Sequence, residues 1–299
     1  MAPADKRNEQ FMKLVRSVHS LVVTDDLDKN RQSQNSIGKI LGTRSKEAVY
    51  SNFMIGDIPA EIVKVNRPYS KKQIILYCHG GGYISGSLHY ARILTTKLAA
   101  ATSMEVLSFD YRLAPEHTFP AALHDALEVW NYLMQKGYGS TDVIVVGDSA
   151  GGNLALSLGL KLKEEQRFLP GGFACLSPWT DLTISGKSHK RKADLDPILD
   201  FAYMNKARYS YIGEETFNNP LISPLFGDFT DFPPVYTQVG SNEILLSDSE
   251  DLHRRLLKQG VLSKLDIYKG MWHVFQMSNF KIANEAVDKI AEFIFTLTR

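Results

Sequence analysis

One serine of the chain has the neighbours of a catalytic nucleophile. Ser149 lies in the run Gly-Asp-Ser-Ala-Gly-Gly at residues 147–152, between an apolar strand-like segment and an apolar helix-like one. In that setting Gly-x-Ser-x-Gly is typical of a nucleophile elbow, a strained turn that exposes the serine hydroxyl. The pattern alone arises by chance in roughly one chain in ten, and an ordinary glycine-rich turn is the alternative. The strand and helix on either side favour the nucleophile.

A glycine-rich loop upstream suits the negative charge that such a reaction develops. Residues 79–83 read His-Gly-Gly-Gly-Tyr and follow another apolar strand-like segment. Three glycines in a row carry no Cβ, so their backbone N–H groups can approach a ligand oxygen closely, as in the HGGG type of oxyanion loop. A phosphate-binding loop would need Lys and then Ser or Thr after the last glycine, whereas Tyr83 and Ile84 stand there. The loop is therefore predicted to bind an acyl oxyanion.

A serine nucleophile also needs a general base, and two histidines downstream are candidates. His273 lies in a Gly-Met-Trp-His-Val run just after the last predicted strand, where a loop can reach back over the edge of a sheet. His253 lies in Leu-His-Arg-Arg-Leu-Leu, a helical pattern that places it on a helix surface. We therefore assign the base to His273.

The base needs a carboxylate to orient it, which is expected between Ser149 and His273 in the chain. Glu243 comes directly off the end of a predicted strand, in a loop. Asp248 follows at what looks like the first turn of the next helix, where the helix dipole favours an acidic residue. Glu243 is the preferred acid, and Asp248 is the alternative.

Alternating strand-like and helix-like segments must hold these residues. From about Lys64 onward short β-rich runs alternate with longer helical ones, and several runs, such as residues 143–146, are apolar throughout. Strands buried on both faces have this composition, so the alternation predicts a mostly parallel sheet with helices on both sides. The predicted strands are 61–66, 73–78, 105–110, 142–146, 172–176, 234–239 and 263–268, and the predicted helices lie near 90–101, 120–136, 151–166, 248–259 and 283–297.

Two segments do not fit this alternation. Residues 1–45 are polar and helix-like, with apolar residues at helical spacing between Phe11 and Val22, and residues 186–211 are charged and aromatic. Long inserts of this kind are often lids over a site, and a helix packed outside the sheet is the other interpretation. Phe201, Tyr203 and Tyr209 would then line a small pocket or pack within the cap. The basic run 187–192 is followed by acidic residues, including Asp194, Asp196 and Asp200, and is interpreted as a solvated loop.

Composition argues against several other classes of protein. The chain has 299 residues, enough for one large α/β domain or two small ones, and its net charge of +1 lacks the basic excess typical of nucleic-acid binding. Cys78 and Cys175 stand in apolar strand-like runs and are predicted to pack as small hydrophobic residues. No run approaches the roughly 18 apolar residues of a membrane span, and the first residues have no apolar signal core. A cytoplasmic location is therefore expected.

Together these motifs resemble those of the hormone-sensitive-lipase-like esterases, the bacterial family IV lipolytic enzymes. Besides residues 79–83 and 147–152, the resemblance includes Asp-Tyr-Arg-Leu-Ala-Pro-Glu at 110–116, Asn-Pro-Leu-Ile-Ser-Pro-Leu at 219–225 and Phe-Pro-Pro at 232–234, and it covers roughly residues 60–299. It implies an α/β-hydrolase fold, with a mostly parallel eight-stranded sheet flanked by helices under a helical cap. The cap would come from residues 1–45 and an insert near 186–215, on a catalytic domain of residues 46–299.

The resemblance also implies roles for particular residues. The oxyanion donors would be the backbone N–H groups of Gly81, Gly82 and Ala150, and no metal or organic cofactor would be needed. The usual acid of the family is an Asp followed by Pro-Leu, whereas Glu243 is followed by Ile-Leu; some relatives carry Glu at this position. The residues expected to support the loops without reacting are His79, Asp148 and the ion-pairing residues Asp110, Arg112 and Glu116.

These observations predict a carboxylic ester hydrolase that acts on small, short-chain acyl esters through Ser149, His273 and Glu243 and an acyl-enzyme. The resemblance leaves acetylhydrolase and lactone hydrolase activity open, and a triad alone does not separate an esterase from an amidase or peptidase. A plant hormone receptor of the same fold uses its pocket for binding and lacks the histidine, whereas His273 is present here. By analogy with the family, a homodimer is possible, with no nucleic-acid partner and no membrane span.

Overall fold

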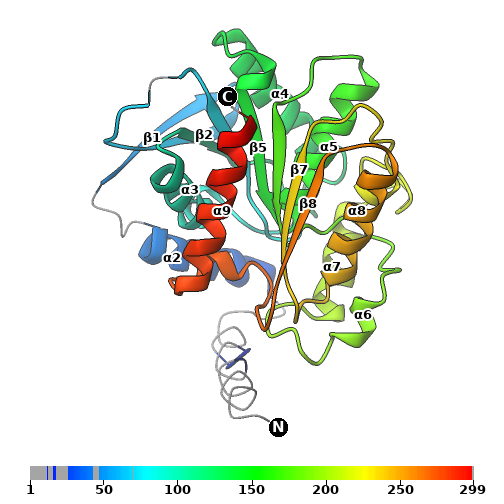
Figure 1. Cartoon of the computed structure of the whole chain (residues 1–299). Coiled ribbons are helices and arrows are strands. Elements are labelled where there is room, and N and C mark those ends of the chain that lie inside the picture. Colours follow the sequence, from blue (N-terminus) through cyan, green and yellow to red (C-terminus); the bar gives the residue numbers. More distant parts are fainter. Residues whose placement is uncertain (1–11, 13–15, 18–25, 43–46, 70, 298–299) are drawn as a thin grey trace.

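A sheet of eight strands forms the centre of the computed structural model, which describes residues 12, 16–17, 26–42, 47–69 and 71–297 (Figure 1). The strand order is β1-β2-β4-β3-β5-β6-β7-β8. Strands β3 to β8 run parallel, and β1 and β2 are antiparallel additions at one edge. This mostly parallel sheet confirms the expected fold class. The strands are β1 Ala48–Ile55, β2 Ile58–Val65, β3 Ile74–Cys78, β4 Glu105–Phe109, β5 Val143–Asp148, β6 Gly172–Leu176, β7 Val235–Gly240 and β8 Ser263–Tyr268.

The inner strands are apolar because helices cover both of their faces. Every residue of β3, β5, β6 and β7 is buried. Successive side chains of a strand point to opposite faces, so Leu76 and Val145 belong to the core on one face, and Ile75 and Ile144 to the core on the other. Burying one such side chain contributes about 1.5–3 kcal/mol. The two cores therefore fix the positions of the strand ends, where the candidate site residues lie.

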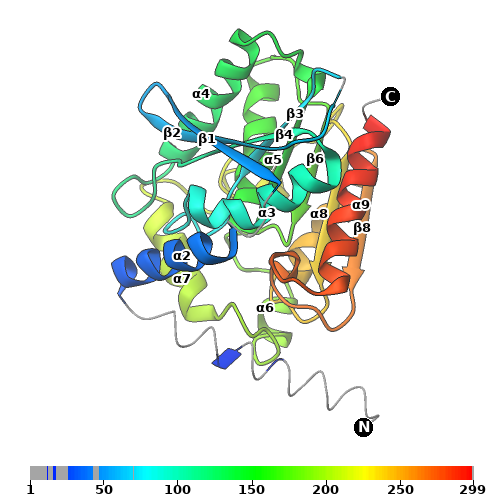
Figure 2. The same ribbon diagram turned by 90° about the vertical axis from the view of Figure 1, so that its left-hand side faces the viewer.

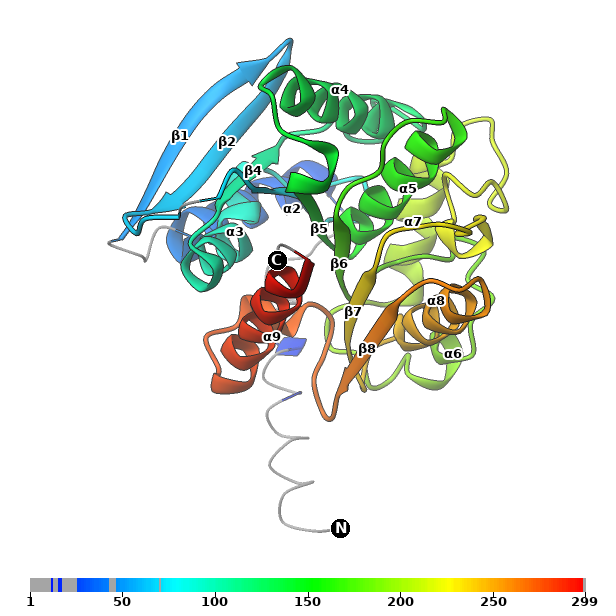
Figure 3. The same cartoon turned by 45° about the horizontal axis from the view of Figure 1, so that its top comes forward.

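Two groups of helices form these cores (Figure 3). Helices α3 and α9 cover one face, where Leu94 and Ile290 are buried, and α4, α5 and α8 cover the other, with Leu123, Leu154 and Leu252. No helix in the part of the chain that the structure describes is long and apolar enough to cross a membrane. The helices are α2 Leu27–Gly42, α3 Leu88–Thr102, α4 Ala121–Gln135, α5 Ala150–Glu164, α6 Ser188–Arg191, α7 Phe201–Tyr211, α8 Leu246–Lys258 and α9 Lys281–Leu297, with short 3-10 segments Ser140–Asp142, Pro224–Phe226 and Phe275–Met277.

Strand β1 is additional to the seven strands predicted from the sequence. It lies at the edge of the sheet, where Ser51 and Asn52 are exposed together with Val49 and Met54. The run therefore shows neither an apolar stretch nor a clear alternation. β1 pairs along its whole length with β2 through a tight turn at Gly56, which has φ +55°. Hairpin pairing, rather than burial, makes this segment a strand.

Helix α2 from the first of the two segments outside the alternation, and helices α6 and α7 from the second, lie at one end of the sheet (Figure 1, Figure 2). Helix α2 packs against α3, and its Arg31 donates hydrogen bonds to the carbonyl oxygens of Ile84 and Ala114, each at 2.8 Å. Helices α6 and α7 form much of the second segment. Of the stretch between Phe11 and Val22, only residues 12, 16 and 17 are described, so the rest of the helical spacing predicted there lies outside the described residues.

The basic run at 187–192 is only partly solvated. Lys187, Lys190 and Arg191 are exposed, but Ser188 and His189 are buried, and the run contains the short helix α6 instead of a loop. The reason is that the Ser188 and His189 side chains bond to the segment at the start of α8. The expectation of a wholly solvated loop is therefore wrong for these two residues.

Replacing Arg31 by Ala should weaken the attachment of α2. Its guanidinium joins α2 to two backbone carbonyls and also meets the Glu116 carboxylate at 2.8 Å. Losing charged hydrogen bonds to partly buried carbonyls should lower the free energy of unfolding by about 1–3 kcal/mol, measured by urea denaturation. Arg254→Ala is the control, because Arg254 makes an exposed pair within α8 and should cost less than about 0.5 kcal/mol. Equal stability of the two variants would contradict the prediction.

Candidate active site

Ser149 lies at a sharp turn between β5 and α5. Its backbone has φ +56° and ψ −121°, a conformation that residues other than glycine rarely adopt. The start of α5 also comes so close to the end of the neighbouring strand β3 that a Cβ built on Gly151 would lie 2.0 Å from the Cys78 carbonyl oxygen. The contact therefore requires glycine at position 151. The turn has the geometry of a nucleophile elbow, with the serine at the carboxyl end of β5 and the amino end of α5.

His273 stands between Ser149 and Glu243. Its Nε2 lies 2.9 Å from Ser149 Oγ, and its Nδ1 lies 3.0 Å from Glu243 Oε2. The serine comes from the β5–α5 turn, the glutamate from the loop after β7 and the histidine from the loop after β8. All three are buried, with 8%, 7% and 0% of Ser149, His273 and Glu243 exposed. The structure thus brings together the three residues that the sequence suggested as nucleophile, base and acid.

Donors besides His273 hold the Glu243 carboxylate. Its Oε1 accepts hydrogen bonds from the Ser177 hydroxyl at 2.7 Å and from the Gly240 N–H at 2.5 Å. The Ser177 hydroxyl also accepts from the N–H of Val274, the residue after His273, at 3.2 Å. Ser177 is not among the residues predicted from the sequence; its one signal there is its place directly after a buried strand. It links the acid loop to the base loop.

Charges around His273 favour its protonated form. Burial by itself lowers the pKa of His273, but the hydrogen bond and charge of Glu243 raise it, and the carboxylates of Asp196 and Asp148 raise it further. The result is a pKa above the ordinary value for histidine. A ring placed in this way accepts a proton from the Ser149 hydroxyl more readily than an isolated imidazole does.

The glycine loop runs next to the elbow. A Cβ built on Gly80 would lie 2.3 Å from Asp148 Oδ2, and the Gly80 N–H donates to Asp148 Oδ1 at 2.9 Å. By contrast, the N–H groups of Gly81, Gly82 and Ala150 find no acceptor among the described residues. Gly81 and Gly82 have φ of +115° and +64°, so the loop turns sharply at both. These three N–H groups, from the residues expected as oxyanion donors, are available to a ligand oxygen.

Asp148 ties the glycine loop to the elbow. Its buried carboxylate accepts hydrogen bonds from the hydroxyls of Tyr77 at 2.5 Å and Tyr90 at 2.9 Å, besides the Gly80 N–H. Burial raises the pKa of Asp148, and these three donors oppose the rise. His79 supports the same loop, because its Nδ1 lies 2.8 Å from the Gly80 carbonyl oxygen. Both residues thus hold the loops, the role that the family resemblance implied for them.

The acidic and basic residues of 110–116 have separate partners. Arg112 pairs with Asp125 at 2.7 Å, and Glu116 forms the ion pair with α2 described above. Asp110 differs from the expectation of an ion pair. Its carboxylate accepts the Leu88 N–H at 2.6 Å, at the start of α3, and pairs with no cation among the described residues. Burial raises the pKa of Asp110 to about 6.

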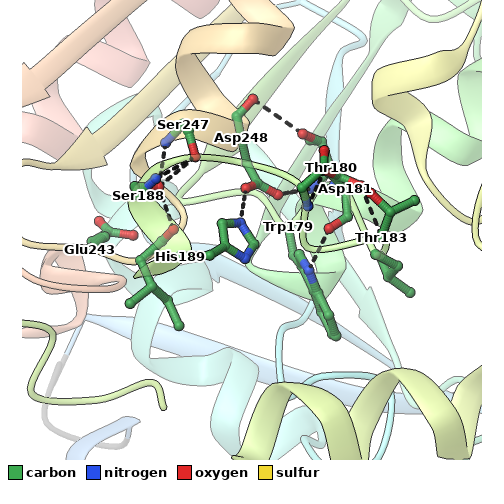
Figure 4. Close-up of polar contacts among 12 residues, drawn as sticks. Trp179, Thr180, Asp181, Thr183, Ser188, His189, Glu243, Ser247 and Asp248 are labelled. Atoms are coloured by element: carbon green, nitrogen blue, oxygen red, sulfur yellow. Dashed lines mark hydrogen bonds and ion pairs between the residues drawn. The ribbon is translucent and has the colours of Figure 1, made fainter. Parts of the chain in front are cut away.

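The alternative acid and base are engaged elsewhere. Asp248 Oδ1 lies 2.5 Å from His189 Nε2, and its Oδ2 accepts the N–H groups of Thr180 and Asp181, each at 3.0 Å. Figure 4 shows Asp248 among these partners, with Glu243 apart from them. The other histidine, His253, lies on α8 and contacts the Ser263 hydroxyl at 2.8 Å. Neither Asp248 nor His253 is hydrogen-bonded to the Ser149–His273 pair in the described structure.

Helix α7 lies over the glycine loop. A Cβ built on Gly82 would lie 2.9 Å from the Tyr203 hydroxyl and 3.2 Å from Ala207 Cβ. Phe201 and Tyr209, which the sequence offered as further lining residues, are 49% and 63% exposed. Of the three aromatic residues that the sequence offered on this helix, Tyr203 is therefore the one that borders the oxyanion loop.

The described residues contain no group of three or more His, Cys, Asp or Glu side chains arranged to hold a metal ion. Cys78 and Cys175 are free and buried within strands. Burial raises the pKa of both thiols, that of Cys175 to about 12. Neither cysteine is therefore a thiolate nucleophile near neutral pH.

Comparison with known proteins assigns the chain to a family. A family model described as alpha/beta hydrolase fold matches residues 75–277. An esterase of Acinetobacter venetianus is 38% identical over 231 residues, 76% of each chain, and an acetyl-hydrolase of Streptomyces hygroscopicus is 35% identical over 221 residues, 74% of this chain and 73% of that one. A crystal structure of a hormone-sensitive lipase from a metagenome library matches over 98% of both chains, with a TM-score of 0.92 and 34% identity. The chain therefore belongs to the α/β-hydrolase-fold family, among its hormone-sensitive-lipase-like esterases, and is a carboxylesterase.

Proposed function

We propose that this protein hydrolyses short-chain carboxylic esters through an acyl-enzyme formed on Ser149. The observation that carries the proposal is the hydrogen-bonded line from Ser149 Oγ through His273 to Glu243, with contacts of 2.9 and 3.0 Å. Serine hydrolysis requires a nucleophile within hydrogen-bond reach of a base, and a carboxylate that orients the base. The raised pKa of His273 suits this role.

In the first half-reaction His273 Nε2 takes the Ser149 proton while Oγ bonds to the ester carbonyl carbon. Glu243 holds the ring through Nδ1 and stabilises the imidazolium. The bond between the acyl carbon and the alcohol oxygen then breaks, and His273 gives its proton to that oxygen. In the second half-reaction water gives a proton to His273 and attacks the acyl carbon. Ser149 Oγ leaves, takes the proton back, and the carboxylic acid departs.

The oxyanion of each tetrahedral intermediate would bind the N–H groups of Gly81, Gly82 and Ala150. These groups have no acceptor among the described residues, so little rearrangement is needed when charge develops on the oxygen. One preorganised donor of this kind is worth about 3 kcal/mol of transition-state stabilisation. The bond from Asp148 to the Gly80 N–H keeps the loop in position for this role.

The preference for short acyl chains follows from the cap. Tyr203 stands close over Gly82, which limits the space beside the oxyanion loop. The Streptomyces relative is named an acetyl-hydrolase, and an acetyl group is a short acyl group of two carbons. The proposal includes a cap formed by residues 1–45 and the insert near 186–215, on a catalytic domain of residues 46–299.

Ser149→Ala should abolish covalent labelling by an organophosphate and nearly all hydrolysis of p-nitrophenyl acetate, because no other hydroxyl or thiol of the described residues is hydrogen-bonded to His273. Intact-protein mass spectrometry measures the label, and rapid mixing of the wild type should show a burst of p-nitrophenol. Ser140→Ala, at the opposite end of β5, is the control and should behave as wild type. Labelling of the Ser149 variant would show that the nucleophile is misassigned, and a wild type with neither label nor turnover would indicate a binding protein.

Glu243→Gln should lower kcat by roughly 10³- to 10⁴-fold, because an amide at this position favours the wrong tautomer of His273. Asp248→Asn should cost far less in kcat, since its partners are His189 and two backbone N–H groups. Steady-state kinetics of the two variants, with circular dichroism to verify folding, decides between them. A crippled Asp248 variant beside an active Glu243 variant would reverse the assignment of the acid.

A chain-length series of p-nitrophenyl esters should give the highest kcat/KM at about C2 to C6, because each methylene that does not fit costs roughly 1–3 kcal/mol in a closed pocket. Tyr203→Ala should move the maximum to longer chains, whereas Tyr209→Ala, on the exposed side of the same helix, should not. A wild-type maximum at about C10 or longer, or a rate jump once substrate exceeds its solubility, would identify a lipase acting at interfaces.

A further inference from the structure

The loop that carries Glu243 is attached to the cap insert through both backbone polar groups of Ile244, its N–H and its carbonyl oxygen. Asp196 Oδ2 accepts a hydrogen bond from the Ile244 N–H at 2.9 Å. The Ser188 hydroxyl donates to the Ile244 carbonyl oxygen at 2.6 Å and accepts from the Ser247 N–H at 2.8 Å; Figure 4 shows Ser188 against Ser247. The insert therefore binds the peptide N–H that directly follows Glu243 and the carbonyl of the next peptide.

Asp196 is the charged member of these contacts. Only 3% of the residue is exposed. Its Oδ1 accepts the N–H groups of Ile198 at 2.9 Å and Leu199 at 3.1 Å, so together with Ile244 three backbone donors surround the carboxylate. No Lys or Arg side chain pairs with this carboxylate among the described residues, and Arg16 contacts the Asp196 carbonyl oxygen instead. Three N–H donors, with no acceptor for a carboxyl proton among the described residues, are the surroundings of an ionised carboxylate.

The charge of Asp196 acts on the proposed acid and base. Burial raises the pKa of Asp196 to about 6, the charge of His273 opposes the rise, and the charge of Glu243 adds to it. The effect is mutual, because Asp196 raises the pKa of His273. The carboxyl group is therefore ionised at the mildly alkaline pH at which ester hydrolysis is usually assayed, and it then favours the protonated ring.

We propose that Asp196 is a positioning residue for the reaction: from the cap insert it fixes the peptide that follows Glu243 and places a further negative charge near His273. The inference rests on the proposed function, since Asp196 acts through the proposed acid and base and touches neither Ser149 nor a substrate. The insert then has two roles: Asp196 supports the loop of the proposed acid, and Tyr203 covers the glycine loop.

The proposal has a consequence for pH dependence. The carboxylates that act on His273 are Glu243, Asp196 and Asp148, and the charged side chains that act on Asp196 are His273 and Glu243. His273 must be neutral to take the Ser149 proton, so activity falls as the pH drops through its pKa. Removing the negative charge of Asp196 lowers that pKa. The acid limb of the profile must then move to lower pH.

Asp196→Asn tests this with the side-chain size unchanged. It removes the charge and turns one acceptor atom into a donor facing a backbone N–H. We expect kcat at pH 8 to fall about ten- to hundredfold, as for a lost charged hydrogen bond, with KM changed less than about threefold. The acid limb of kcat/KM should move down by roughly half a pH unit or more. Asp200→Asn is the matched control, because Asp200 is an exposed N-cap of α7 in the same insert and Asn caps equally well; it should do neither.

Ser188→Ala separates position from charge. It removes the hydroxyl that binds the Ile244 carbonyl and changes no charge. We expect a loss of kcat of about three- to tenfold with the acid limb in place. The variant also tests the support from the insert if Asp196→Asn fails to fold. Wild-type kcat in folded Ser188→Ala and Asp196→Asn, or an unmoved acid limb in Asp196→Asn, would overturn the inference.

A double-mutant cycle with Glu243→Gln closes the test. If Asp196 acts through Glu243, adding Asp196→Asn to Glu243→Gln should cost less than about threefold in kcat. A double variant whose loss equals the product of the single losses would show that Asp196 acts independently, and would overturn the inference. A fully active Glu243→Gln would instead overturn the proposed function, so the two failures are distinguishable.

Discussion

The buried carboxylate of Glu243 is the constraint on which the rest of the site depends. A charge with no exposed surface is costly unless donors replace the lost water, and its donors here are the Ser177 hydroxyl, the Gly240 N–H and the His273 ring. They follow or end β6, β7 and β8, three neighbouring strands. Parallel strands place their carboxyl ends at one edge of a sheet, so the parallel arrangement brings these three donors around the Glu243 carboxylate. The two apolar cores that hold this register are in that sense part of the site.

A second buried carboxylate, that of Asp148, is likewise surrounded by hydrogen-bond donors, and it lies beside the glycine loop. Asp148 receives the hydroxyls of Tyr77 and Tyr90 and the Gly80 N–H, and it thereby fixes the first glycine of the loop. The next two glycines keep their N–H groups without a protein acceptor among the described residues. Asp148 and Glu243 also raise the pKa of His273 together. Buried carboxylates therefore hold both loops in place and raise the pKa of the histidine between them.

The sequence predicts those parts of the site whose signals are local. Ser149 stands between a recognisable strand and helix, and His273 and Glu243 follow strand ends, so each could be found from its neighbours. Ser177 and Asp196 have no such signal, because their roles come from contacts with residues 66 and 48 positions away. In the sequence Asp196 stands among charges that are mostly exposed, and only the folded insert buries it. Strand β1 is missed for a related reason, since pairing with β2 rather than its own composition makes it a strand.

The described part of the chain contains two buried histidine–carboxylate pairs, and their difference shows what the proposed base has besides a carboxylate. The His189–Asp248 contact of 2.5 Å is shorter than the His273–Glu243 contact of 3.0 Å, and the pKa of both histidines is raised, in each case against the effect of burial. The distinction lies in the second ring nitrogen. His273 Nε2 meets the Ser149 hydroxyl, whereas His189 Nδ1 has no partner among the described residues. In the proposed mechanism the first pair takes up the Ser149 proton, whereas the second pair joins α6 to α8. Because Glu243 and Asp248 lie in one short segment, the same stretch of chain sets the position of the proposed acid and the attachment of α6.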